Sequence, residues 1–465
     1  MTSEETPLLI GVDAVDVDHE AIYNRFSRRR KWMIVAITAL IATLPFWSSG
    51  SFVPLIPQIA KDLHSTGPVV GLSVSLSMFA NALGSLMWAS YSGFYGRRPV
   101  LLLSMFIAVW GSFGSGVATS VAQLLVWRVV QAFGASSGHS VGIAVIADIY
   151  KMEERGGASG AFFGAVLFGM ALAPTVSGFS AHYWDWRMTQ YQIGGAASLA
   201  FILTAIFQPE TSHPGTRGID RQINSEGRPK WVWLNPLTNL ALLRSPNVLL
   251  VSVAQGLIVL TDFMLLIPIA YTFGVKYGIT NEAIIGAMCI PVGLGNVIGS
   301  SWSGPYSDRL LISLRKRRKG IWIGEDRLRA TYLGGGLLAP MSILVSGLMT
   351  QFWKGNGSFI PNMLCLVING IGVAIVFNPA NAYLIDILHD RSAEVTAANM
   401  ATRNLIVALA VGLFLPSLEK FGVAIAFSGV AAVAWLGYGL IILVIVHGER
   451  MRKWMDLGFS TQKSN

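Results

Sequence analysis

The chain has 465 residues, of which 53% are hydrophobic and only 13% are charged, and its mean hydropathy is +0.55. Soluble domains carry about 25% charged residues, so this composition excludes an ordinary soluble protein and indicates an integral membrane protein. The formal net charge is +9. Because the basic residues fall mainly between apolar segments, they describe one face of a membrane and imply no nucleic-acid partner.

Twelve apolar segments are long enough to cross about 30 Å of hydrocarbon as helices. Placing the N-terminus in the cytoplasm puts 27 of the 34 basic residues on that side, five outside and two within spans. Cytoplasmic loops carry the excess of lysine and arginine, so this is the expected orientation. The segments lie near 32–56, 69–89, 100–118, 122–147, 157–181, 189–208, 247–271, 283–303, 330–351, 358–385, 397–417 and 423–447.

The spans divide into two sets of six. We expect a cytoplasmic tail over 1–30, a first bundle over 31–208, a cytoplasmic linker over 209–245, a second bundle over 246–448 that includes a basic loop over 304–329, and a cytoplasmic tail over 449–465. The basic run in that loop is expected to contact anionic lipid headgroups. A glycosylation sequon at Asn356 falls in an external loop, which agrees with the orientation.

Span 5 is apolar but rich in small residues. Gly160, Gly169 and Gly178 leave part of its surface without side chains, so a neighbouring backbone can approach closely, and Pro174 removes a backbone donor and kinks the helix. The pattern predicts a moving contact between the two halves. A tightly packed membrane helix with no special role is the alternative.

Span 4 carries a buried arginine. A charge at the position of Arg128 is unfavourable unless it faces water or a partner, and Gln131 and His139 lie on the same side of the helix. This polar stripe indicates a substrate or proton role for Arg128. The alternatives are that Arg128 braces neighbouring helices and that His139 is a satisfied buried histidine.

The second half holds a lone carboxylate. Asp262 in span 7 is well inside the span, and Gln255 lies on the same face seven residues earlier. Burial of an unpaired carboxylate favours its neutral form, so such a group can load and release a proton, although structural pairing with a cation is the alternative. Further polar candidates in spans 8, 10 and 11 are Asn296, Asn378, Asn399 and Arg403.

Cytoplasmic loop residues repeat between the halves, as a duplicated architecture predicts. Tyr-Ser-Gly-Phe at 91–94 after span 2 corresponds to Tyr-Ser-Asp-Arg at 306–309 after span 8, and Asp148 near the end of span 4 corresponds to Asp386 after span 10. A tight turn and basic pair follow span 2. The gating candidates in these loops are Gly96, Arg97, Arg98, Asp148, Asp308, Arg309 and Asp386.

Over nearly its whole length the chain resembles the major facilitator superfamily, and within it the fungal branch of twelve-span drug:proton antiporters. Gly160, Gly169, Pro174 and Gly178 are similar to the span 5 antiporter motif, and Arg128 with Gln131 to the span 4 motif. The loop ending at 95–99 resembles the most widespread motif, but the aspartate and arginine of that motif are replaced by glycine and phenylalanine. Asp308 and Arg309 keep that pair in the second half, where Asp308 is expected to cap the start of span 5.

The resemblance implies an all-α membrane protein with two pseudo-symmetric six-helix bundles around a central cavity lined by spans 1, 4, 7 and 10. It implies a proton-coupled antiporter that exports a small organic molecule and uses the proton gradient rather than a cofactor. Two buried arginines against one buried aspartate favour an organic acid such as an itaconate-like dicarboxylate. A multidrug or secondary-metabolite efflux pump is the alternative, and a facilitator or importer is a further one.

Other classes of protein fit the sequence less well. It contains no metal-ligand cluster, nucleotide-binding loop or nucleophile arrangement, so we expect neither an enzyme nor a bound metal. Cys289 and Cys365 both lie in spans and indicate no disulfide framework. We expect a monomer in contact with lipid, protons and a small-molecule substrate, located in the plasma membrane, with vacuolar and endosomal membranes as alternatives.

Overall fold

The computed structural model describes Tyr23 and residues 25–150, 155–213, 217–226, 231–321, 323–388 and 392–454. Over this part of the chain all regular structure is helical. The expected cytoplasmic tails lie mostly outside the described residues. The surroundings of Gly160 and the side chain of Asn356 also lie outside what the structure describes, so the span 5 role of the first and the glycosylation of the second stay predictions.

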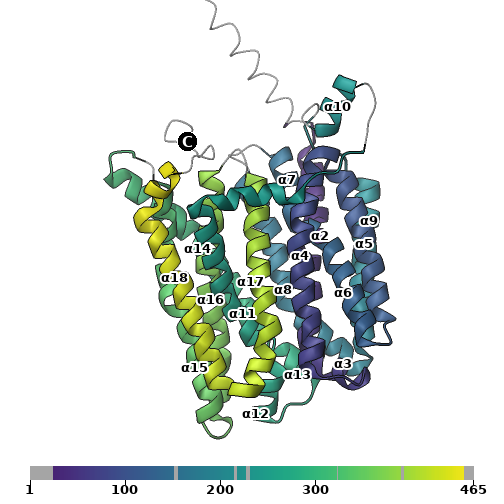
Figure 1. The fold of residues 1–465 in the computed structure, drawn as a ribbon, viewed down its shortest axis with the longest axis vertical. Helices are drawn as coiled ribbons and strands as arrows, with labels where there is room; N and C mark the ends of the chain where they lie inside the picture. The colour runs from purple at the N-terminus through teal and green to yellow at the C-terminus, as the bar shows by residue number, and fades with distance from the viewer. Residues whose placement is uncertain are drawn as a thin grey trace, which may run out of the picture.

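The first six spans form one bundle (Figure 1). Spans 1 and 4 are each built from more than one helical segment, and α4 and α8 are the longest helices of the six. The segments are α2 (Arg28–Phe52), η1 (Val53–Leu55), α3 (Ile56–Asp62), α4 (Gly67–Tyr95), α5 (Arg97–Gly116), α6 (Val121–Ala135), α7 (Ser137–Ile149), α8 (Arg155–Tyr183) and α9 (Trp186–Phe207).

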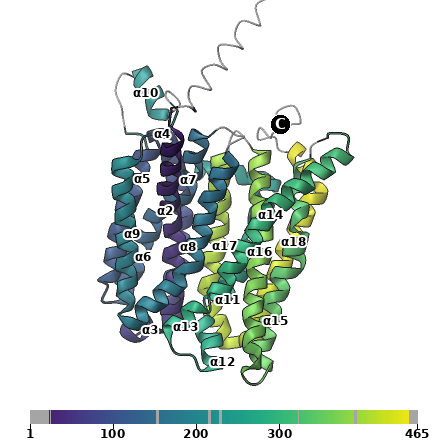
Figure 2. The same ribbon diagram turned by 180° about the vertical axis from the view of Figure 1, so that it is seen from behind.

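The second bundle lies beside the first, and the two views in Figures 1 and 2 show the helices of both running roughly parallel to one axis. The linker contributes α10 (Gly218–Glu226) and η2 (Pro236–Arg244). The remaining segments are α11 (Pro246–Leu266), η3 (Ala270–Gly274), α12 (Val275–Tyr277), α13 (Glu282–Ala287), α14 (Ile290–Arg317), η4 (Gly324–Thr331), η5 (Gly334–Leu338), α15 (Ala339–Phe352), η6 (Asn356–Ser358), α16 (Phe359–Ile387), α17 (Ser392–Phe421) and α18 (Val423–Trp454).

Eleven helical stretches in the described residues are long and apolar enough to cross a membrane. The remaining expected span corresponds to α8, which runs unbroken through Pro174. Large apolar side chains such as Trp110, Leu409 and Val446 are exposed on the outside of the bundle, where they face lipid. The expected loop over 304–329 begins as helix, because α14 continues to Arg317.

The two bundles close against each other at the end opposite the linker. Phe52 and Ile56 of the first half share one buried cluster with Leu265 and Phe414 of the second. On the α4–α17 side the Ser75 hydroxyl donates a 2.5 Å hydrogen bond to the carbonyl oxygen of Ala408. By the distribution of basic residues this closed end is the external one, so the structure is closed toward the outside.

The small residues of α8 serve two different contacts. A Cβ at Gly178 would collide with the carbonyl oxygen of Glu282 in α13, so this glycine allows close packing between the halves. Thr175 beside it donates a 3.2 Å hydrogen bond to the carbonyl oxygen of Gly286. A Cβ at Gly169, however, would collide with Thr43 of α2, so this glycine packs within the first bundle. Of these two glycines, the one at the external end of span 5 therefore makes the expected contact between the halves.

The cytoplasmic turn between α4 and α5 is held by Glu210. Gly96 has φ +106°, a conformation open to glycine, and a Cβ there would collide with the Glu210 carboxylate. That carboxylate accepts hydrogen bonds from the backbone N–H groups of Arg97 at 2.9 Å and Arg98 at 3.2 Å. A carboxylate at a helix N-terminus is stabilising, so the end of span 6 caps the start of span 3.

Equivalent ion pairs occur in the cytoplasmic ends of the two bundles. Arg97 Nε lies 3.0 Å from Asp148 Oδ2, and Arg327 Nε lies 2.8 Å from Asp386 Oδ2. Arg327 also lies 2.8 Å from Asp308 Oδ1 through Nη1. The Asp308 carboxylate thus pairs with the η4 arginine of its own bundle. Because residues 151–154, directly before α8, lie outside the described part of the chain, the expected cap on span 5 stays a prediction. Arg309 is exposed.

Candidate functional site

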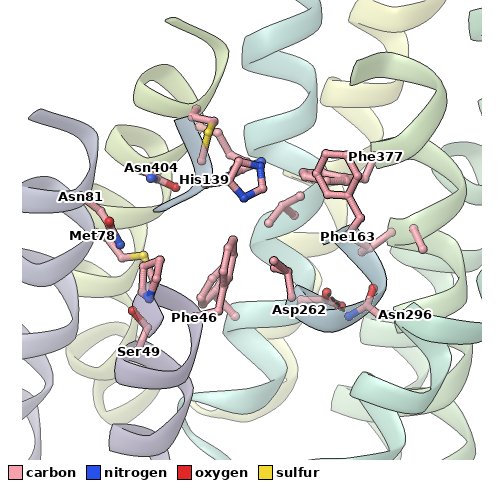
Figure 3. A pocket seen from close by; sticks show the side chains of 18 of the residues that line it. Phe46, Ser49, Met78, Asn81, His139, Phe163, Asp262, Asn296, Phe377 and Asn404 are labelled. Atoms are coloured by element: carbon pink, nitrogen blue, oxygen red, sulfur yellow. Dashed lines mark hydrogen bonds between the residues drawn. The ribbon is translucent and has the colours of Figure 1, made fainter. Parts of the chain in front are cut away.

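A cavity of about 100 Å³ lies between the two bundles. Figure 3 shows Phe46, Ser49, Asn81 and His139 of the first half facing Asp262 and other side chains of the second across it. Its wall is contributed by α2, α4, α7 and α8 on one side and by α11, α14, α16 and α17 on the other. A void shared in this way changes shape when the bundles move relative to each other.

Asp262 is the carboxylate that lines this cavity. Its side chain is 4% exposed, and Oδ2 accepts a 3.0 Å hydrogen bond from the amide of Asn296. Oδ1 is buried and has no hydrogen-bond partner among the described residues. No arginine, lysine or histidine of the described chain lies within ion-pair distance of this carboxylate, so the alternative of structural pairing with a cation does not hold here.

Arg403 is the guanidinium that lines the same cavity. It is 4% exposed, and its Cζ lies 5.0 Å from the centre of the Phe377 ring, a cation–π contact. Within the described part of the chain, no hydrogen bond from the Arg403 guanidinium and no carboxylate within ion-pair distance is present. Asp262 and Arg403 therefore line the same cavity without forming an ion pair with each other.

His139 also lines the cavity, surrounded by aromatic rings. Its ring centroid lies 5.8 Å from that of Phe46, 6.1 Å from that of Phe162 and 5.6 Å from that of Phe163. Its Nδ1 is buried without a hydrogen-bond partner among the described residues. The alternative of a satisfied core histidine is thus not what the described residues show.

A larger vestibule of about 410 Å³ joins the cavity on the cytoplasmic side. Four residues line both spaces, so the two lie next to each other: Phe163, Ser300, Phe377 and Asn378. Asp308 and Arg327 at the cytoplasmic end of the second bundle line the vestibule as well. Asn378 donates a 2.9 Å hydrogen bond to the Ser303 hydroxyl, which orients its amide at this junction. The site is open toward the cytoplasm and closed toward the outside.

Arg128 and Gln131 do not line the cavity, contrary to expectation. Arg128 is fully buried, and its Nη1 donates to the Ser48 hydroxyl at 2.7 Å and to Gln131 Oε1 at 2.6 Å. Gln131 donates in turn to Ser112 and Gln190, at 2.9 and 3.3 Å. This network joins α2, α5, α6 and α9, so in the structure Arg128 braces the first bundle, which was the alternative interpretation.

Gln255 and Asn399 form a second network just outside the cavity wall. The amide of Asn399 donates to Gln255 Oε1 and to Asn381 Oδ1, both at 2.8 Å, and Gln255 donates to the carbonyl oxygen of Phe377 at 3.2 Å. Only Asn381 of the three lines the vestibule. These amides connect α11, α16 and α17 and hold the helices that carry Asp262 and Arg403.

The structure adds residues that the sequence did not single out. Asn404 lines the cavity beside Arg403, and Figure 3 shows it near Asn81 at the end away from Asp262. A polar residue within span 11 is a signal that could have indicated Asn404. Phe163 and Phe377 gave no such signal, because aromatic side chains are common in all spans. No group of three or more metal-ligating side chains occurs in the described residues.

Two bundles of membrane-crossing helices around a shared cavity that contains buried charged groups define the class of membrane transporters. Residues 36–412 match the family model of the Major Facilitator Superfamily, and the chain belongs to this family. It is 24% identical over 460 residues to the efflux pump radE of Floropilus chiversii, covering 95% of this chain and 84% of that protein.

Other relatives agree with this assignment. The MFS antiporter QDR3 of Candida albicans is 22% identical over 563 residues, covering 93% of this chain and 80% of that protein. The crystal structure of the human organic anion transporter MFSD10 shares the fold, with a TM-score of 0.57 at 13% identity, covering 88% of this chain and 99% of that one. The chain is thus a multi-pass membrane transporter of this superfamily, and the fungal relatives named efflux pump and antiporter agree with the branch that its motifs resemble.

Proposed function

We propose that the protein is a proton-coupled antiporter that exports a small organic molecule by alternating access. The observation that carries this proposal is the unpaired carboxylate of Asp262 in a cavity that both bundles line. Burial without a cation favours the protonated form of a carboxylate. A group whose surroundings change when the cavity changes sides can therefore bind a proton on one side of the membrane and release it on the other.

The transport cycle follows from the two ends of the cavity. Opened to the outside, Asp262 takes up a proton. Opened to the cytoplasm, as in the structure, the cavity receives substrate through the vestibule, and the substrate displaces the proton. Separation of α8 from α13 and of α4 from α17 opens the external end. The relatives named efflux pump and antiporter support export by exchange.

The substrate class is proposed from the cavity wall. Phe46, Phe163 and Phe377 give it a largely apolar surface, with polar groups from Asn81 and Asp262 at opposite ends. Such a wall fits a drug-like molecule or secondary metabolite. An itaconate-like dicarboxylate is the second candidate, which the unpaired Arg403 favours. Because Arg128 lies outside this wall, only one cavity arginine is available for two carboxylates.

Flux measurements test the proposal. In inside-out vesicles that contain the protein, substrate uptake is expected to rise when the lumen is made acidic and to return to baseline when a protonophore removes the gradient. Uptake that ignores the gradient would show a facilitator, and absence of any flux would show a protein that does not transport. Metabolite profiling of a strain lacking the gene identifies the compounds to be labelled.

A further inference from the structure

We infer that the substrate is a zwitterionic amphiphile, in which an anionic group contacts Arg403, a protonated amine contacts Asp262 and an apolar body fills the space between them. The inference rests on the proposed function and names the substrate class of the same cavity. It rests on Asp262 and Arg403, two buried ionisable groups of the cavity that lack partners of opposite charge, and on the apolar wall around them.

The anionic group is assigned from Arg403. A buried guanidinium is strongly destabilising when nothing neutralises it, yet Arg403 has no carboxylate partner among the described residues and faces a void. Phe377 covers the guanidinium on one side at 5.0 Å. Planar guanidinium groups bind carboxylates through paired hydrogen bonds, so one anionic group of the substrate completes this part of the site.

The amine is assigned from the requirement of exchange. A substrate driven by proton antiport must compete with the proton for the same carboxylate, and the acceptor atom that lacks a hydrogen-bond partner here is Oδ1 of Asp262. A substrate that is only an anion would favour protonation of Asp262 instead of competing with it, because removal of the carboxylate charge reduces repulsion. A protonated amine at Oδ1 replaces the proton directly. The titratable groups facing this space are Asp262, Arg403 and His139.

Both charged groups belong to the same bundle. Asp262 lies on α11 and Arg403 on α17, and the amide network of Gln255, Asn381 and Asn399 joins these two helices through α16. The Asp262 carboxylate and the Arg403 guanidinium form no ion pair with each other and line the same cavity. A ligand in this cavity can therefore contact both groups. The first bundle supplies Phe46, Phe163 and Met78, which contact an apolar body. The second bundle therefore binds the two charged groups of the ligand, and the first bundle contacts its apolar body.

Three probes with the same aromatic body test this assignment: L-phenylalanine, 3-phenylpropanoate and 2-phenylethylamine. Their binding to the purified full-length protein in detergent is measured by calorimetry, and the protons released are measured in weakly buffered solution. We expect the zwitterion to bind at least about tenfold more tightly than either singly charged probe, as one charge-assisted hydrogen bond predicts. The zwitterion and the amine release protons, whereas the acid does not.

Matched variants locate the two contacts. In Arg403→Gln, the affinity for the zwitterion is expected to fall to the affinity for the amine. In Asp262→Asn, the affinity for the zwitterion is expected to fall to the affinity for the acid, and proton release is expected to be lost. Lys316→Gln and Asp185→Asn change the same charges outside the cavity and serve as controls for folding and binding. Retention of each variant as a monodisperse peak in size-exclusion chromatography shows that it is folded.

The outcomes separate the inference from the proposed function. Stronger binding of the acid or of the amine than of the zwitterion, with proton release still dependent on Asp262, overturns the zwitterion and leaves proton antiport standing. Binding of none of the three probes also overturns the inference. Tight zwitterion binding without proton release by any probe supports the ligand class but contradicts the proposed exchange at Asp262.

Discussion

The amide of Asn296 donates a 3.0 Å hydrogen bond to Oδ2 of Asp262, and the other carboxylate oxygen, Oδ1, has no partner within the described chain. One oxygen is thus held by a hydrogen bond, while the other is buried and has none. This arrangement holds the carboxylate in a defined orientation between α11 and α14 without neutralising its charge.

Asp262→Asn is expected to abolish uptake driven by a pH gradient while leaving the amount of protein in the membrane unchanged. Asparagine keeps the size and the contact with Asn296 but cannot bind or release a proton. Flux in inside-out vesicles, measured from pH 5 to pH 8, should lose its pH dependence. Asp185→Asn, at an external loop, is the control. Coupling that persists in Asp262→Asn would remove this carboxylate from the mechanism.

Asn296→Ala is expected to weaken coupling less severely. The substitution removes the donor that orients Asp262 but leaves the carboxylate itself. The loss of one hydrogen bond to a charged group corresponds to about 1.5–3 kcal/mol, so the pH dependence of transport should shift relative to that of the wild type. The same pH series detects this shift. A profile identical to that of the wild type would show that Asn296 does not position the acid.

Gly178→Val is expected to prevent closure of the external end. The valine side chain would collide with the main chain of α13 at Glu282, where the two bundles pack closely. A steric clash of this kind destabilises the closed state by about 1–3 kcal/mol, so transport should fall at least about tenfold. Flux assays check the loss, and labelling of a cysteine introduced into the cavity checks the greater access from outside.

Gly195→Val is the matched control for the external contact. A Cβ at Gly195 meets nothing within 4 Å, so the same added volume on α9 should leave transport unchanged. An equal loss of flux in Gly178→Val and Gly195→Val would mean that the substitutions impair folding rather than closure of the external end.

Asp148→Asn is expected to destabilise the protein more than Asp386→Asn. Arg97, which is 17% exposed at its side chain, has Asp148 as its one recorded acidic partner in the described residues, whereas Arg327 contacts both Asp386 and Asp308. Removal of the single partner leaves a partly buried charge unpaired, a loss of about 1–3 kcal/mol after screening by solvent. Thermal unfolding in detergent compares the two variants, and a reversed order would contradict the assigned pairings.

Tyr95→Phe is expected to release the linker from the first bundle. The Tyr95 hydroxyl donates to the carbonyl oxygen of Val232 at 3.1 Å and accepts from its N–H at 3.0 Å, while the ring stacks on Trp231 at 5.5 Å. Loss of the hydroxyl removes about 1 kcal/mol of stabilisation at this contact. Limited proteolysis should cut the linker faster at unchanged overall stability, and unchanged cleavage would show that the ring contact alone retains it.

The sequence by itself determined the class of the molecule and its division into two halves. Hydropathy and length are local properties, so the spans could be placed without knowing which helices are neighbours. The isolation of Asp262 was also visible, because it is a lone carboxylate within a long apolar segment. The glycine motif of α8 predicted a contact between the bundles. The external part of this motif, at Gly178, makes such a contact with α13.

Tertiary structure decided which charges share a space. Helical periodicity places Arg128 and Gln131 on one face, but only packing shows that Arg128 donates to Ser48 and Gln131 and does not line the cavity. Arg403 has no such neighbours and faces the void with Asp262. The partner of Asp308 was decided in the same way, since Arg327 reaches it from η4. A span reveals its own polarity, whereas the partner of a buried charge depends on how helices distant in sequence pack together.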